Sequence, residues 1–221
     1  MTASAELLAQ ARARLYTAVL SDTLDSAGYR NQAMHPAIRP LDENLVMCGR
    51  ARTGLFRDVY HVEEGENPYE LEIALIDDLK PGDVAVMACG KTGRIAPWGE
   101  LLSTAAQCRG AAGCVTDGLT RDVRYIRAIK FPVFHGGIGP LDSKGRGKLV
   151  AIDMPAECGG VLVNPGDLIF GDVDGVVVIP RAVETEVLKR ALDKVESENS
   201  TRACLKQGML LREVYEKYGV L

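Results

Sequence analysis

The chain has 221 residues, with 26 basic and 30 acidic side chains and a formal net charge of −4 at pH 7. Its 47% hydrophobic and 25% charged residues are typical of a soluble globular protein and exclude a disordered chain. The mixed, slightly acidic charge excludes a surface built to bind a phosphate backbone, so we expect no nucleic-acid partner. Because the sequence shows neither a targeting pattern near Met1–Leu15 nor a long apolar run, we expect a cytoplasmic protein without a membrane partner.

The cysteines and histidines are too scattered to form a metal cluster in the sequence. All six cysteines stand singly, without the C-x-x-C spacing of a zinc or redox site, so we expect most of them to be reduced and buried. The three histidines, His35, His61 and His135, are also far apart. A metal ion would therefore be held by oxygen ligands, which favours Mg²⁺ or Mn²⁺.

The first third of the chain is predicted to contain helices and one long strand. Apolar residues recur at helical intervals within Ala5–Ala27, and Ser21–Asp22 is predicted to cap a second, short helix that ends at Gly28. Met47–Leu55 alternates in the manner of a strand, and Glu70–Asp78 has the apolar spacing of a helix.

Two Pro-Gly-Asp turns are each predicted to lead into a buried strand. Lys80–Asp83 precedes Val84–Met87, and Asn164–Asp167 precedes Leu168–Phe170. In such turns proline presets φ at one corner and glycine accepts a positive φ at the next.

Helices and strands alternate between these two turns. The pattern predicts a helix at Leu101–Arg109, a strand at Gly113–Asp117, a helix at Asp122–Ile129 and a strand at Val133–Phe134. This order with short connections predicts an α/β layered fold with several parallel strands. We interpret the glycine-rich Gly136–Pro140 that follows as a loop.

The C-terminal part is predicted to be helical after one last strand. Gly175–Pro180 contains an unbroken apolar run, which is typical of a strand buried on both faces. Ala182–Gln207 then predicts a long amphipathic helix, and Arg212–Tyr218 a shorter one. We divide the chain into a catalytic domain, residues 1–180 with the N-terminal helices, and a helical extension, residues 181–221. The extension is expected to pack on a neighbouring subunit, although the pattern equally allows it to fold back on its own sheet.

Two short segments combine groups that could bind a small anion. Gly99–Leu102 opens a predicted helix, where backbone N–H groups and the helix dipole attract a carboxylate. Arg121–Asp122 lies between a strand and the next helix, at the edge where open α/β sheets bind ligands. Arg121 offers a planar fork for a carboxylate or an enolate oxygen, and Asp122 offers one hard ligand for a metal. Glu100 could support a water molecule on that metal.

Each of these residues also has a plainer interpretation. Arg121 and Asp122 could form a surface pair at a helix start, with Asp122 as the N-cap. Glu100 could simply be a favourable charge in a first helical turn. The combination of the glycine, the arginine and the aspartate at this spacing favours the binding site.

The segments that carry this pattern also resemble a known family. They are Gly99–Leu102, Asp117–Gly118, Arg121–Asp122, Phe131–Phe134, Pro165–Asp167 and Asp172–Pro180. Over roughly residues 12–205 the chain resembles the superfamily of 4-hydroxy-4-methyl-2-oxoglutarate aldolases and regulators of ribonuclease E activity (the regulator of ribonuclease E activity A-like superfamily).

The resemblance implies a fold, an assembly and a chemistry. The fold would be a swivelling β/β/α domain with a central mixed, partly parallel sheet and a long C-terminal helix, assembled as a trimer or a hexamer. The enzymes of the superfamily are similar to class II pyruvate aldolases, in which a divalent ion and an arginine stabilise a pyruvate enolate. The same machinery commonly decarboxylates oxaloacetate.

The resemblance also implies roles for individual residues. Asp122 would bind the metal directly, Arg121 would bind the substrate oxygens, and Gly99, Glu100, Leu101 and Leu102 would bind the pyruvate carboxylate. Arg121, Asp122 and Glu100 would then be the catalytic residues.

Two carboxylates are implied to reach the metal through water. One is Glu100, where the family usually has aspartate, and the other is Glu198 from a partner's terminal helix, with Glu196 as the alternative. A further departure is Tyr125, where the enzyme motif often has an acid, and this leaves the natural substrate open.

We therefore expect a carbon–carbon lyase: a divalent-metal-dependent aldolase that cleaves a 4-hydroxy-2-oxo acid to pyruvate and decarboxylates oxaloacetate. Its partners would be a small 2-oxo acid substrate and further copies of itself. The rival hypothesis is a non-catalytic regulatory protein that binds a ribonuclease or a helicase. The Arg121–Asp122 pair and Glu100 favour the enzyme, because a protein-binding surface needs no metal-ligating carboxylate beside a carboxylate-binding helix start.

Overall fold

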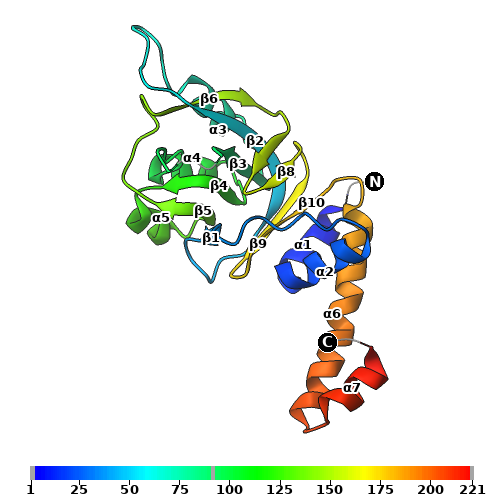
Figure 1. Ribbon diagram of the computed structural model, residues 1–221. Coiled ribbons are helices and arrows are strands. Elements are labelled where there is room, and N and C mark those ends of the chain that lie inside the picture. Colours follow the sequence, from blue (N-terminus) through cyan, green and yellow to red (C-terminus); the bar gives the residue numbers. More distant parts are fainter. Residues whose placement is uncertain (1–2, 91–92, 220–221) are drawn as a thin grey trace.

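The structure, a computed structural model, describes residues 3–90 and 93–219. Within these residues a curved sheet carries helices on its outer faces, and a long helix leads away from the body (Figure 1). The helices are α1 (Ala5–Arg14), α2 (Thr17–Ser26), α3 (Glu70–Asp77), α4 (Glu100–Cys108), α5 (Val123–Ile129), α6 (Glu184–Lys206) and α7 (Leu211–Tyr218). The strands are β1 (Arg39–Pro40), β2 (Met47–Asp58), β3 (Asp83–Ala88), β4 (Gly113–Thr120), β5 (Val133–Ile138), β6 (Gly147–Ile152), β7 (Ala156–Cys158), β8 (Val161–Val163), β9 (Leu168–Asp172) and β10 (Gly175–Ile179).

The central sheet is mixed, as predicted. Its order is β1-β5-β4-β3-β2-β9-β10, with β6 also paired to β2. Strands β2, β3, β4 and β5 are parallel to one another, whereas β1, β6, β9 and β10 join antiparallel. The predicted fold class, a β/β/α domain with a partly parallel sheet and a long C-terminal helix, is confirmed.

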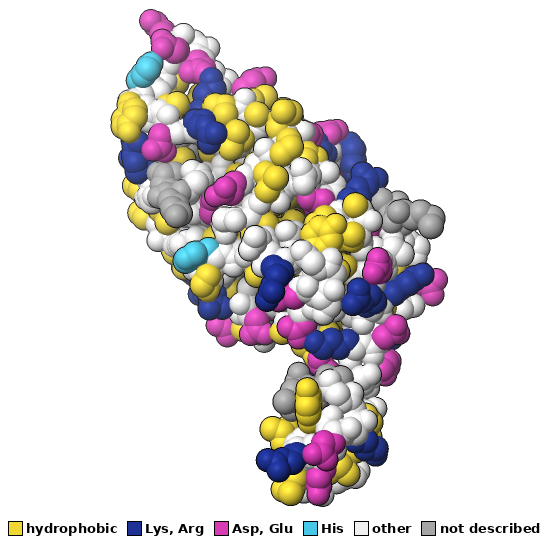
Figure 2. All heavy atoms as spheres, turned by 45° about the vertical axis from the view of Figure 1, so that its right-hand side comes forward, with side chains coloured by type: hydrophobic (Ala, Val, Ile, Leu, Met, Phe, Trp, Pro, Cys, Tyr) yellow, Lys and Arg dark blue, Asp and Glu magenta, His cyan; other side chains and the backbone are white. Residues whose placement is uncertain are grey.

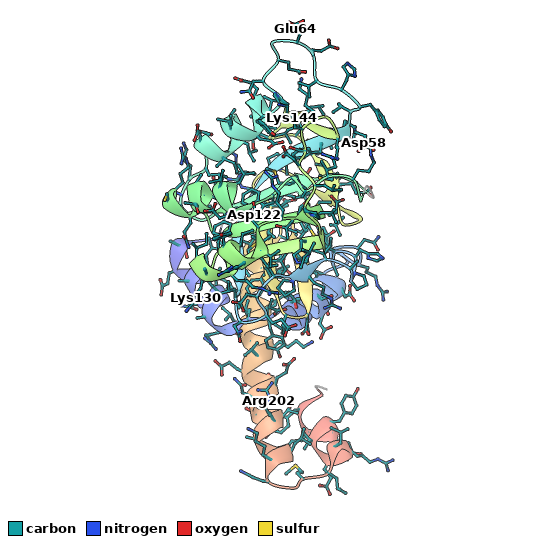
Figure 3. The ribbon with its side chains drawn as sticks, turned by 90° about the vertical axis from the view of Figure 1, so that its left-hand side faces the viewer. Asp58, Glu64, Asp122, Lys130, Lys144 and Arg202 are labelled. Atoms are coloured by element: carbon teal, nitrogen blue, oxygen red, sulfur yellow. The ribbon has the colours of Figure 1, made fainter. Side chains whose placement is uncertain are left out.

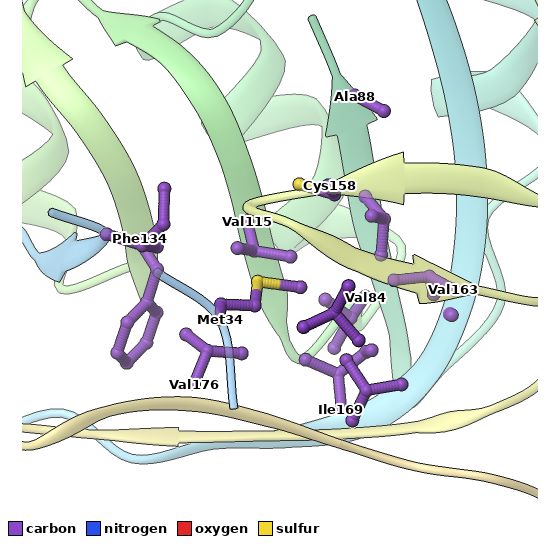
Figure 4. Close-up of a cluster of buried hydrophobic side chains, with 14 of the residues drawn as sticks. Met34, Val84, Ala88, Val115, Phe134, Cys158, Val163, Ile169 and Val176 are labelled. Atoms are coloured by element: carbon purple, nitrogen blue, oxygen red, sulfur yellow. The ribbon is translucent and has the colours of Figure 1, made fainter. Parts of the chain in front are cut away.

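The parallel strands are apolar throughout because both of their faces are covered. On β3, Val84 and Val86 point into one cluster with Phe134 and Ile169, which the β7–β8 hairpin closes (Figure 4). Ala85 and Met87 point the other way, into a second cluster that α3, α4 and α5 cover. Strands with two buried faces lose the alternation of polar and apolar residues, which explains their continuous apolar runs.

The break between the first two helices was predicted at the wrong place. The second helix begins at Thr17, not after Ser21–Asp22, and the chain between the helices is extended at Leu15 and Tyr16. The reason is a distant carboxylate: Asp172, at the end of β9, accepts bonds from the Thr17 amide at 2.8 Å and the Thr17 hydroxyl at 2.6 Å. A cap supplied by another element leaves no mark in the local pattern.

The interpretation of the glycine-rich segment as a loop was wrong for its first part. Strand β5 continues through Gly136 to Ile138 and pairs with β4. Gly136 lies so close to β4 that an added Cβ would stand 2.5 Å from the Asp117 carbonyl oxygen. The glycine therefore marks a close approach of two strands.

Helix α6 divides into a packed half and a projecting half. Val187, Leu188, Ala191, Leu192 and Val195 are buried in one cluster with α1, α2 and the outer face of β9 and β10. The rest of α6 and α7 stand away from the body (Figures 1 and 2). The first half of the helix thus shares a core with the N-terminal helices, and contact of the remainder with a neighbouring subunit stays a prediction.

Among the helices of residues 3–90 and 93–219, none has the length and apolar character needed to span a membrane.

The cysteines are free thiols, as predicted. Cys48, Cys89, Cys114 and Cys158 are buried, Cys108 is exposed and Cys204 lies between these limits. Burial raises the pKa of the Cys48 thiol to about 11, so this side chain stays protonated and unreactive at neutral pH.

Asp172→Ala should destabilise the fold, because Thr17 then loses both bonds to a buried carboxylate. We expect the free energy of unfolding to fall by about 2–3 kcal/mol, the usual cost of unsatisfied groups and a lost cap. Urea unfolding followed by circular dichroism measures this. Asp174→Ala is the matched control: Asp174 is exposed on the same turn, and a change of less than about 0.5 kcal/mol is expected. Equal stability of the two variants would contradict the role of Asp172.

Candidate active site

The site is assembled by main-chain pairing at the end of β4. The segment before α4 runs parallel to this strand end, with an isolated bridge between Trp98 and Thr120. The Trp98 carbonyl accepts bonds from the Arg121 amide at 3.0 Å and the Thr120 hydroxyl at 3.2 Å. Trp98 itself is fully buried, and its indole N–H donates to the Ser103 hydroxyl at 2.7 Å. These bonds hold the start of α4 beside Arg121.

The N-terminus of α4 presents its amides at this point. Gly99 is the N-cap, and the first three amides of the helix, on Glu100, Leu101 and Leu102, have no partner inside it. The Glu100 amide donates to the Asp122 carboxylate at 3.3 Å. A Cβ on Gly99 would lie 2.7 Å from the same carboxylate oxygen, so only glycine allows this approach.

Asp122 does not cap its own helix. It stands at the N-cap position of α5 with a left-handed backbone, φ 58°, and makes no side-chain bond to α5. Its carboxylate points instead to α4, and 44% of the side chain remains exposed. The plainer interpretation of Asp122 as a simple N-cap is therefore wrong, and the strained backbone is one that asparagine and aspartate tolerate best.

Arg121 is oriented by two carboxylates. Its Nε lies 3.7 Å from Asp122 Oδ2, and its Nη2 lies 3.5 Å from Asp142 Oδ1. The side chain stays 38% exposed. The two carboxylates thus flank the guanidinium at ion-pair distance and leave its planar fork able to bind a ligand.

Arg121, Asp122 and the start of α4 open onto one cavity of about 370 Å³. Asp122 lies on the body of the molecule, far from the projecting end of α6 (Figure 3). The volume is in the range of small-molecule sites. The lining residues come from α3, from residues 96–102, from the β4–α5 junction and from the loop after β5: Tyr69, Glu72, Ile73, Ala96, Pro97, Trp98, Gly99, Leu101, Leu102, Arg121, Asp122, Asp142 and Ser143.

Glu72 is a cavity residue that sequence reasoning missed. It is only 4% exposed, and the Ser143 hydroxyl donates to its Oε1 at 3.2 Å. Burial raises the pKa of Glu72 to about 7, although the bond from Ser143 opposes this shift. The apolar spacing could have revealed it: with Leu75 and Ile76, Glu72 occupies positions i, i+3 and i+4 on the buried face of α3.

Asp142 and Tyr69 form a second pair that the sequence did not indicate. The Tyr69 hydroxyl donates to Asp142 Oδ2 at 2.5 Å. Burial and this bond raise the pKa of Tyr69 to about 12, so the phenol stays protonated. Asp142 also faces Arg121 and accepts a bond from the Ser143 amide at 2.8 Å. No regular spacing marks a loop residue of this kind.

The other predicted carboxylates lie elsewhere within this chain. The Glu100 side chain accepts a bond from the Thr104 hydroxyl at 2.8 Å, along its own helix, and does not line the cavity. Glu198 accepts a bond from the Tyr16 hydroxyl on the projecting part of α6, one turn before Arg202 (Figure 3). Glu196 pairs with Arg14. A role for Glu198 or Glu196 at the site therefore needs a second subunit and stays a prediction.

The donor set fits a hydrated hard cation. Among residues 3–90 and 93–219, no group of three His, Cys, Asp or Glu side chains could hold a metal by itself. Asp122 offers one partly exposed carboxylate beside the cavity. Mg²⁺ is commonly bound by one or two carboxylates and keeps several waters, so a single aspartate is compatible with it.

The chain belongs to the RraA-like family: residues 17–178 match the family model described as Aldolase/RraA. It is 38% identical over 202 residues to a Halalkalibacterium halodurans protein named "Putative 4-hydroxy-4-methyl-2-oxoglutarate aldolase". The match covers 91% of this chain and 90% of that protein. The predicted family is therefore confirmed, and relatives within it are named as aldolases.

Solved structures agree with this family and fold. Streptomyces coelicolor RraAS2, described as an unusual member of the RNase ES inhibitor RraA protein family, is similar with a TM-score of 0.80 and 28% identity over 91% of this chain and 98% of that chain. A Pseudomonas syringae pv. tomato protein is similar with a TM-score of 0.84 and 26% identity over 97% of this chain and 98% of that chain.

Gly99→Ala should damage the site without unfolding the protein. The new Cβ would lie 2.7 Å from Asp122 Oδ2 and 3.2 Å from Arg121 Cγ, so both flexible side chains would have to move away from the start of α4. We expect the affinity for pyruvate, measured by calorimetry, to fall at least about tenfold, or 1.4 kcal/mol. The thermal unfolding midpoint should hardly change. Unaltered pyruvate affinity would show that this close approach does not matter for binding.

Proposed function

We propose that the protein is a divalent-metal-dependent lyase that cleaves a 4-hydroxy-2-oxo acid to pyruvate and also decarboxylates oxaloacetate. The observation that carries the proposal is the convergence of Arg121, Asp122 and the first amides of α4 on one cavity. This set combines a cation, a hard anionic ligand and neutral donors within the reach of one small molecule.

The proposed chemistry follows from where charge develops. When a bond next to a 2-oxo group breaks, negative charge gathers on the former ketone oxygen. Arg121 would stabilise that oxygen, while the amides of Leu101 and Leu102 would hold the carboxylate. A bound Mg²⁺ or Mn²⁺ at Asp122 would supply further positive charge there. Cleavage and decarboxylation pass through the same enolate, so one site serves both.

The assembly follows from the family resemblance and the projecting helix. We propose a cytoplasmic trimer or hexamer, in which α6 of a neighbouring subunit brings Glu198 near the cavity. The exposure of α6 and α7 away from the body leaves them available for this contact (Figure 2). No direct nucleic-acid ligand is proposed.

A second candidate function is supported by the similarity to RraAS2. A member of an RNase inhibitor family acts through a surface, and a regulator of this kind would bind a ribonuclease or a helicase without chemistry. The cavity and its oriented arginine favour the enzyme. A pyruvate-release assay over oxaloacetate and several 4-hydroxy-2-oxo acids, with and without divalent metal, separates the two: a pure regulator releases no pyruvate.

Asp122→Asn should abolish metal-dependent pyruvate release from oxaloacetate, with kcat falling at least about 100-fold. Asparagine is preferable to alanine because it tolerates the left-handed backbone, so the loss would report the missing charge. Asp153→Asn is the matched control, since Asp153 has a similar φ of 53° but pairs with Arg52 outside the cavity. Activity that persists in Asp122→Asn or in excess chelator contradicts the assignment.

Arg121→Lys should also lower kcat/KM for oxaloacetate by about 100-fold. Lysine keeps the charge but cannot reproduce a fork held between two carboxylates. Steady-state kinetics at saturating Mg²⁺ measures the effect. Turnover close to wild type would mean that Arg121 does not contact the substrate.

A further inference from the structure

Cleavage of a 4-hydroxy-2-oxo acid requires a base, and the cavity contains a buried carboxyl with no role assigned so far. We propose that Glu72 is the catalytic base that takes the proton from the C4 hydroxyl of the substrate. This inference rests on the proposed lyase function and deepens it. Glu100 is the catalytic carboxylate that the family resemblance implied. Its side chain accepts a hydrogen bond from the Thr104 hydroxyl and does not line the cavity.

The position of Glu72 suits this task. It lies on α3, whereas Arg121 follows β4 and the free amides belong to α4, so a different element brings the carboxyl to the same cavity. A substrate whose 2-oxo acid half binds at Arg121 would extend its C4 end across the cavity. The Ser143 hydroxyl holds Glu72 Oε1 at 3.2 Å, which orients the carboxyl. Its 4% exposure keeps bulk water away from the proton in transfer.

The surroundings of Glu72 keep its carboxyl in the neutral pH range. The titratable groups that act on it or feel its charge are Asp142, Arg121, Tyr69 and Cys89. Burial is the main cause of its raised pKa, about 7, followed by the lowering bond from Ser143, the raising charge of Asp142 and the lowering charge of Arg121. A base with a pKa near the working pH can both accept and return a proton.

The step balances without a further reactant. Glu72 accepts the C4 hydroxyl proton, the C4 oxygen becomes a carbonyl, and the C3–C4 bond breaks. The electron pair of that bond forms the enolate of pyruvate, whose oxygen faces Arg121. Protonated Glu72 then returns the proton to C3, which becomes the methyl group of pyruvate. Oxaloacetate has no C4 hydroxyl, so loss of CO₂ from it requires no base, and water entering the cavity supplies the proton that its enolate takes up at C3.

This difference provides the test. In the Glu72→Gln variant, kcat for cleavage of 4-hydroxy-4-methyl-2-oxoglutarate should fall about 100- to 1,000-fold. Oxaloacetate decarboxylation should stay within about threefold of wild type, because the enolate-binding groups are untouched. Glutamine still accepts the bond from Ser143, so the fold should be kept. Glu70→Gln is the matched control: Glu70 is exposed on the same helix and does not line the cavity, so the cleavage rate of this variant should remain close to wild type.

The pH dependence provides a second test. The base form of Glu72 exists above its pKa, so kcat/KM for cleavage should rise with pH to a plateau above about 7. Ser143→Ala removes a bond that lowers the pKa of Glu72, and the rising limb should therefore move to higher pH. The decarboxylation profile should lack this limb.

Two results would contradict the role of Glu72, and a third would contradict the lyase function itself. Cleavage at the wild-type rate in Glu72→Gln, or an equal loss of both reactions, means that Glu72 is not the base. A rising limb that Ser143→Ala leaves in place means the same. Failure of the wild-type protein to release pyruvate from either substrate overturns the lyase function itself, and the inference with it.

Discussion

The main-chain pairing of Trp98 with the end of β4 is the interaction on which the site depends. It brings an element that follows β3 against the residue that follows β4, and so places the amides of α4 beside Arg121. Because the Trp98 side chain is buried and bonded to Ser103, the segment cannot shift without disturbing the core. The geometry of the site is thus set by backbone bonds at the edge of the sheet.

Asp122 connects this framework to the cavity. Its left-handed backbone turns the carboxylate away from α5 and toward the first turn of α4, where Gly99 leaves room for it. The same carboxylate orients Arg121 from one edge, and Asp142 does so from the other. One arginine between two carboxylates is a partly neutralised cation, which suits the proposed site, where a metal ion would also bind.

The cavity separates two kinds of acid. Asp122 and Asp142 face Arg121, whereas Glu72 is buried beside Ser143 on the α3 wall. Burial disfavours the charged form of Glu72, whereas the Asp122 and Asp142 side chains are partly exposed beside the guanidinium. Groups whose environments differ in this way can serve different steps of one reaction, with binding on one wall and proton transfer on the other.

The sequence by itself determined most of the helices, the parallel strands of the α/β layer and the proximity of Gly99–Leu102 to Arg121–Asp122. These features follow from apolar periodicity, turn residues and the short connections between parallel strands, which are local properties. Only the tertiary structure decided that Asp172 caps α2 from a distance, that Glu100 lies outside the cavity and that Glu72 and Asp142 line it. Those placements depend on contacts between residues far apart in the chain, and no local pattern contains such contacts.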